Sequence, residues 1–110
     1  MHQRVTLSFT PLTPDTQRLI AQDFSPEDQL AAAELLEQKC GSSLPLMGDR
    51  PPEEIERVRF AVLKLCHGSV ERLAQEIDMA NCDWRDTLVG AGFGHSVLAH
   101  RTWFSEHTGG

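Results

Sequence analysis

Apolar residues recur at helical spacing in several segments of the chain, most clearly over residues 52–67. There, counting from Ile55, apolar side chains fall at i, i+3, i+7, i+10 and i+11, and Pro52 with two following glutamates opens the segment. Phe60, Ala61 and Leu63 widen the apolar surface well beyond one stripe. A helix that is apolar over so much of its circumference belongs at the centre of a core. We therefore expect this helix to be central to the fold.

The segment 25–40 carries equally clear start and stop signals. Ser25 precedes Pro26 and two acidic residues, as at the start of many helices, and Gly41 follows the last apolar position. The pattern predicts one buried stripe along this helix. Its members are Leu30, Ala32, Ala33, Leu36 and Cys40.

Four further helices are predicted from weaker patterns. A short one begins at Thr13 or Asp15 and reaches Phe24. Another follows the cap Ser69 and runs to about Asn81. The next begins at Asp83, with Asp86 completing a capping arrangement, and buries Trp84, Leu88 and Ala91. The last spans 95–105 and points Val97, Leu98 and Phe104 inward.

The remaining segments are predicted to be irregular. Residues 1–12 form an extended arm, in which 4–9 alternate polar and apolar as in a strand. Residues 41–51 form a loop that Leu44, Leu46 and Met47 hold to the core, and 108–110 form a frayed tail. The prediction is a single all-α domain over residues 1–110, a compact bundle of four to six short helices.

Composition and charge narrow the function classes. The formal net charge is −6, which argues against generic binding to nucleic acid or anionic membrane and is compatible with a basic protein partner. Solubility alone also accounts for a charge of this size. There is no secretory signal and no apolar run of membrane-spanning length. The three cysteines are a poor disulfide framework, so we expect a cytoplasmic protein.

One third of the chain carries a recognisable order of segments. Residues 57–65 read RVRFAVLKL, a Gly turn and a helix follow, and residues 83–94 read DWRDTLVGAGFG. This order resembles a segment of small uncharacterised bacterial proteins. The resemblance implies a helical fold and a bacterial cytosolic origin, and it assigns no functional residue.

A helix-turn-helix regulator is one alternative function. Leu73-Ala74-Gln75-Glu76-Ile77 followed by Trp84 has the apolar skeleton of that motif. However, Asp78 stands where the turn usually has glycine. Asp83 and Asp86 would also face DNA phosphates with the wrong sign of charge.

A small metal- or cysteine-dependent enzyme is a second alternative. The cysteines and histidines show no zinc-type spacing, and we expect no metal or other cofactor. Cys40 and Cys66 sit on apolar stripes and are expected to be structural. Cys82 precedes a helix start, a better place for a reactive thiolate, but no set of acid, base and oxyanion donors accompanies it. We expect no catalytic residues.

Surface recognition is the function that the sequence favours. Arginine and tryptophan are frequent in binding hot spots, and both occur in the C-terminal segment. The chain is predicted to bind another protein, as an inhibitor or immunity-type protein that blocks a basic partner, and a homodimer is a further possibility. The predicted partner-binding residues are Asp83, Asp86, His100, Arg101, Trp103 and Phe104.

Overall fold

The computed structural model describes residues 10–109, which form five helices and, within that range, no strand. The helices are α1 (Pro14–Asp23), α2 (Pro26–Lys39), α3 (Pro52–Cys66), α4 (Val70–Gly90) and α5 (Ala99–Thr108). The all-α bundle is therefore confirmed. No helix in the described range is both long and apolar enough to cross a membrane.

The helix starts follow the predicted caps. The Thr13 hydroxyl accepts a hydrogen bond from the Thr16 backbone N–H at 3.2 Å, and the Ser69 hydroxyl accepts one from Arg72 at 3.2 Å. Prolines occupy the first turn of α1, α2 and α3. Local sequence therefore sets where four of the helices begin.

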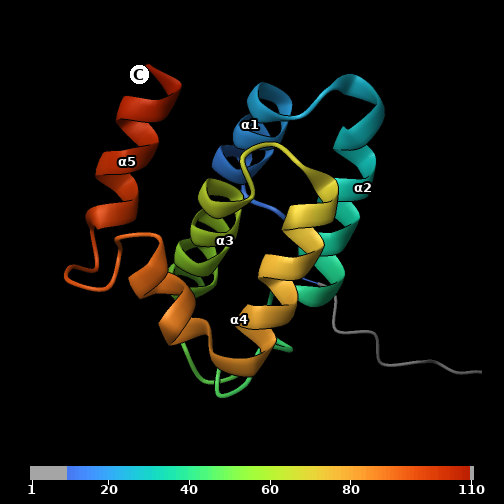
Figure 1. The fold of residues 1–110 in the computed structure, drawn as a ribbon. Helices are drawn as coiled ribbons and strands as arrows, with labels where there is room; N and C mark the ends of the chain where they lie inside the picture. The colour runs from blue at the N-terminus through green and yellow to red at the C-terminus, as the bar shows by residue number, and fades with distance from the viewer. Residues whose placement is uncertain (1–9, 110) are drawn as a thin grey trace, which may run out of the picture.

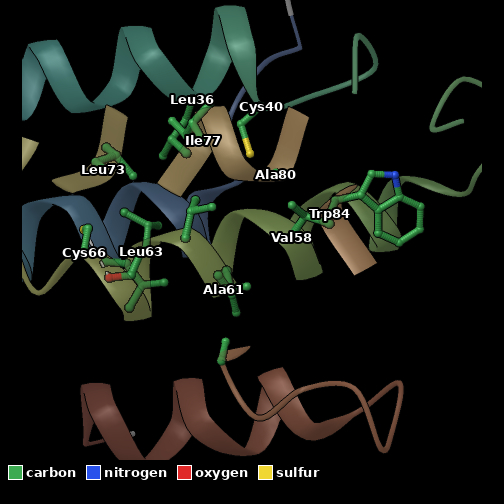
Figure 2. Packing of buried hydrophobic residues seen from close by; sticks show 14 of the residues in the cluster. Leu36, Cys40, Val58, Ala61, Leu63, Cys66, Leu73, Ile77, Ala80 and Trp84 are labelled. Atoms are coloured by element: carbon green, nitrogen blue, oxygen red, sulfur yellow. Dashed lines mark hydrogen bonds between the residues drawn. The ribbon is translucent and has the colours of Figure 1, made fainter. Parts of the chain in front are cut away.

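The centre of the bundle is α3, as predicted. It packs against α1, α4 and α5, while α2 lies along α1 and α4 (Figure 1). Leu36 of α2 meets the layer formed by Leu73 and Ile77 of α4 (Figure 2), and Leu63 of α3 belongs to the same hydrophobic core. All four side chains are buried.

The α3–α4 turn is built on left-handed backbone. His67 has φ +51° and Gly68 has φ +77°. A Cβ at Gly68 would lie 2.5 Å from the backbone oxygen of Asp23, so only glycine fits where this turn crosses the end of α1. The turn brings the C-terminal ends of α1 and α3 together.

The helix α4 bends at one residue. Asp83 leaves the helical region (φ −161°, ψ 96°), and its carboxylate accepts a hydrogen bond from the Arg85 backbone N–H at 3.1 Å. The predicted second start at Asp83 therefore exists, but no loop separates the two halves. A helix-turn-helix has a turn of three to four residues, so its geometry is not reproduced here.

Two apolar side chains in the first half of the chain, Leu30 and Leu46, are not where the pattern predicted them. Leu30 is 70% exposed, because it lies two residues, or about 200° around the helix, from the buried Ala32. Leu46 is also exposed and has φ +62°, so only Leu44 and Met47 hold the loop to the core. The loop is fastened in addition by Trp84, whose indole N–H donates to the Pro45 carbonyl at 2.6 Å.

The last helix begins later and ends later than predicted. Arg57 donates to the carbonyls of Phe93 and Ser96, and the Ser96 hydroxyl accepts from the Leu98 N–H, so this stretch stays irregular. As a result Val97 and Leu98 are exposed, which corrects their prediction as inward-facing.

The two chain ends are described only in part. Thr108 ends α5 and Gly109 is its C-cap, so α5 includes the first residue of the predicted tail. Residues 1–9 of the predicted arm, with the expected strand at 4–9, and Gly110 lie outside the described residues. Thr10–Leu12 has no regular secondary structure, and the Thr10 N–H donates to the Glu37 carbonyl.

Candidate functional site

The inner face of α5 is organised around one ring of α3. Phe60 is fully buried, and the rings of His100, Trp103 and Phe104 lie 5.4, 6.0 and 5.2 Å from it. His100 and Phe104 are buried as well. Both side chains, which the sequence predicted to bind a partner, fill the interface between α5 and the rest of the bundle.

Arg101 is also engaged within the chain. Its guanidinium donates to Asp15 of α1 and to Glu56 of α3, each at 2.8 Å, and lies over the rings of Phe60 and Phe104. It ties α5 to two helices at once. Its charge is therefore largely balanced inside the protein and is not free for a partner.

Trp103 is the one aromatic residue of the predicted set that reaches the surface of α5. It is half-buried, and its ring stacks on His107 at 4.8 Å. His107 in turn lies 2.9 Å from a carboxylate oxygen of Asp23, which joins the end of α5 to the end of α1. The indole thus forms part of the wall of a groove along α5.

The groove along α5 consists of two adjoining cavities of about 430 and 350 Å³ that share Lys64 and Trp103. The larger lies where α1, α3 and α5 end. It is lined by Asp23, Leu63, Lys64, His67, Gly68, Trp103 and His107. The smaller runs toward the start of α5 and includes Phe93, His95, Leu98 and Glu106. We call this feature the α5 groove.

The α5 groove was only partly visible in the sequence. The cluster of C-terminal histidines with Trp103 drew attention to α5, but Asp23, Lys64 and His67 were not singled out. They belong to other helices, and only the turn at Gly68 brings them to α5. No local pattern in the sequence encodes that meeting.

The buried position of His100 disfavours the protonated, positively charged form of its imidazole. It is 4% exposed, and its Nδ1 has no hydrogen-bond partner among the described residues. Burial lowers the pKa of the imidazole, and Arg101 and Arg57 lower it further, whereas Glu56 and Glu54 act in the opposite direction. The neutral form is therefore the one that fits the fold.

This position of His100 predicts a pH-dependent stability. The unfolded chain takes up the proton near the ordinary pKa of about 6.5, and the folded chain does so only at lower pH, so stability is complete above that value and falls as pH decreases below it. His100→Leu should lose less stability than the wild type between pH 7.5 and 5.5 in urea unfolding. His95→Gln, at an exposed position, should keep the wild-type profile. Equal losses in the wild type and His100→Leu would contradict the assignment.

The cysteines divide into two buried thiols and one exposed one. Burial raises the pKa of Cys40 to about 12 and also raises that of Cys66. Neither is poised to form a thiolate. Cys82 is exposed. Among residues 10–109 no three His, Cys, Asp or Glu side chains are grouped so as to hold a metal ion.

The two predicted acidic residues lie together at a second hollow. A cavity of about 270 Å³ lies beside the α4 bend, between α4 and Leu65 of α3, and Asp83 and Asp86 line it with Glu76. Its other lining residues are Leu65, Met79, Cys82, Thr87 and Gly90. We call it the α4 groove. It combines a mostly apolar floor with three carboxylates.

Comparisons with protein-family models, curated proteins and solved structures found no match. The side chains of the two grooves are therefore the basis for what we propose about function.

Proposed function

We propose that this chain is a protein-binding module that takes a basic partner on the face formed by α2 and α4. The observation that carries the proposal is the distribution of charge. α2 contains four carboxylates and one lysine, and α4 contains five carboxylates and two arginines. Each helix thus has a net charge of −3, and the two account for the whole formal charge of −6. The rest of the sequence has as many basic as acidic side chains.

The two acidic helices lie side by side, so their fields add (Figure 1). The Asn81 side chain of α4 donates to the Lys39 carbonyl of α2 at 2.9 Å, which fixes their register. Five of the nine carboxylates belong to exposed residues, and they are Glu27, Glu34, Glu71, Asp78 and Asp86. A basic protein would be steered to this face from solution.

The α4 groove lies at the edge of this face, between α4 and Leu65 of α3, and offers an apolar anchor point beside it. Met79 is 63% exposed beside the cavity, and methionine adapts its shape to different partners. The two arginines nearby form only loose pairs, Arg72 with Glu76 at 3.6 Å and Arg85 with Asp83 at 3.4 Å. Such exposed pairs are worth little and can be exchanged for a partner's charges. The proposed occupant is an amphipathic basic segment of another protein, with an apolar residue in the groove.

Blocking a basic partner, in the manner of an inhibitor or immunity protein, is the form of this function that we favour. An acidic face of this kind competes with whatever acidic or anionic surface the partner would otherwise bind. The proposal needs no catalytic group on this chain.

A fluorescently labelled amphipathic Lys/Leu peptide tests the proposal in an anisotropy titration. The paired variant Asp83→Asn/Asp86→Asn should weaken binding fivefold or more at low salt, because it removes two carboxylates of the groove. Asparagine at 83 keeps an oxygen for the cap. The matched control Asp49→Asn/Glu53→Gln removes two exposed carboxylates outside this face and should change affinity less than twofold. Equal weakening by both pairs would reject the α2–α4 face as the binding surface.

A further inference from the structure

The α5 groove differs from the acidic face, because it combines a lysine with an apolar wall. Its larger cavity, about 430 Å³, is within the size range of small-molecule sites. Leu63 and the indole of Trp103 supply apolar wall, and Phe93 continues it in the adjoining cavity. This groove is independent of the face proposed for the basic partner.

Lys64 stands at the junction of the two cavities and is held in place. Its ammonium donates to the Ala91 carbonyl at 2.7 Å and lies 5.1 Å from the centre of the Phe93 ring. An ammonium has three N–H donors, so two remain for a ligand. Within the described range no carboxylate forms an ion pair with it. Lys64 therefore offers a positioned positive charge that the protein does not itself neutralise.

Two other side chains of the larger cavity also offer hydrogen-bond donors to a ligand. Neither the His67 imidazole nor the Trp103 indole N–H makes a hydrogen bond to another described side chain or backbone group, so both have capacity for a ligand. The carboxylate of Asp23 is already paired with His107. The larger cavity thus presents free donors, and it fits a ligand that brings acceptors. Each cavity also holds one carboxylate, Asp23 in the larger and Glu106 in the smaller. Asp23 is paired with His107, whereas Glu106 forms no ion pair within the described residues, so the anionic end of a ligand belongs at Lys64 and His67.

We propose that the α5 groove binds a small aromatic anion, its flat ring system along Trp103 and its acidic group at Lys64. A carboxylate and a phosphate ester share this recognition chemistry. The ring lies against the apolar wall, and the oxygens take the free N–H donors of Lys64 and of the neighbouring imidazole or indole.

The test titrates the wild-type protein with 2-naphthoate and, as the matched control, with its uncharged analogue 2-naphthamide. Binding of each ligand is monitored in ¹⁵N-¹H spectra of the protein. We expect naphthoate to bind with a Kd of about 0.1–1 mM, the range for a ligand of about a dozen heavy atoms, and to shift the Trp103 indole N–H peak. The amide should bind at least fivefold more weakly. Equal binding of acid and amide, or no binding at 5 mM, about fivefold above that range, would overturn the proposal.

Two variants and two further ligands locate the site. The chain has two lysines, and Lys64→Gln should weaken naphthoate binding at least fivefold while Lys39→Gln, on the acidic face, should change it less than twofold. Equal affinities in the two variants would place the anion elsewhere and overturn the assignment.

Two further ligands identify the head group. If naphthyl phosphate binds as well as or better than naphthoate, the result supports an aromatic anion as the ligand and selects a phosphate head group. Inorganic phosphate that competes as strongly as naphthoate would contradict the role of the aromatic wall. The wild-type comparison of acid and amide decides the matter even if Lys64→Gln fails to fold.

Discussion

Replacing Arg59 by leucine is expected to lower the free energy of unfolding by about 3–5 kcal/mol. Arg59 lies in the middle of α3 and is 2% exposed. Its guanidinium donates to four backbone carbonyls at 2.6–3.2 Å, which belong to Thr10, Pro11, Leu36 and Cys40. The side chain therefore joins α3 both to the end of α2 and to the segment that precedes α1.

The position of these carbonyls explains why a buried guanidinium is stable in the middle of α3. Two of them, those of Leu36 and Cys40, are at the C-terminal end of α2, where the helix dipole is negative. The Leu36 carbonyl also accepts the Cys40 N–H, whereas the Cys40 carbonyl has no other donor among the described residues. Burial lowers the pKa of Arg59, but arginine starts from so high a value that the charge is kept. Leucine would fill part of the volume and leave the carbonyls of Thr10, Pro11 and Cys40 without their donor. Because these acceptors are backbone, no compensating change of a partner side chain could rescue the loss.

Urea unfolding followed by circular dichroism measures the effect. Arg72→Leu is the control, since Arg72 is an arginine of α4 with a half-exposed side chain and a loose pair to Glu76. It should cost no more than about 0.5 kcal/mol. A loss below 1 kcal/mol for Arg59→Leu, less than one orphaned buried acceptor should cost, would show that water replaces the guanidinium at the end of α2.

The role of Arg59 marks the limit of what the sequence could predict. The apolar periodicity of 52–67 was strong enough to place α3 at the centre of the bundle, and the structure confirms it. The same periodicity treats Arg59 as one more polar position. Its partners are carbonyls 19 to 49 residues away, and a carbonyl has no sequence signature. Only the packed fold shows that this arginine is internal.

The C-terminal segment shows a similar limit for the candidate sites. The sequence marked Trp103 and the histidines as candidates, but it could not tell which side chains face inward, because α5 starts four residues later than the pattern suggested. That start depends on Arg57, which fixes the carbonyls of Phe93 and Ser96 from α3. By contrast Asp83 and Asp86 remained at the surface, because a capping carboxylate must stay near a helix start whatever the tertiary packing.

Replacing Phe60 by alanine is expected to cost about 3–5 kcal/mol and to release α5 in particular. Phe60 is the ring on which His100, Trp103 and Phe104 converge, and the Arg101 guanidinium lies over it. α5 fully buries only His100 and Phe104. Ala99 and Trp103 are partly buried against the core, and the other ties of α5 are ion pairs and hydrogen bonds. A cavity at Phe60 would remove the common contact of its apolar face. The α5 groove should open with it, because one wall of that groove is α5 itself.

Amide hydrogen exchange distinguishes this release from general destabilisation. Phe24→Ala is the matched control, because Phe24 is equally a buried phenylalanine, lies between α1 and α2, and makes none of the ring contacts that hold α5 to Phe60. In Phe60→Ala the amides of α5 should exchange at least tenfold faster relative to those of α3, whereas in Phe24→Ala that ratio should stay near its wild-type value. Phe60→Leu should restore most of the protection, since it keeps much of the apolar volume. If both alanine variants accelerate α5 and α3 in parallel, the helix is part of one cooperative unit, and Phe60 is then a core residue like any other.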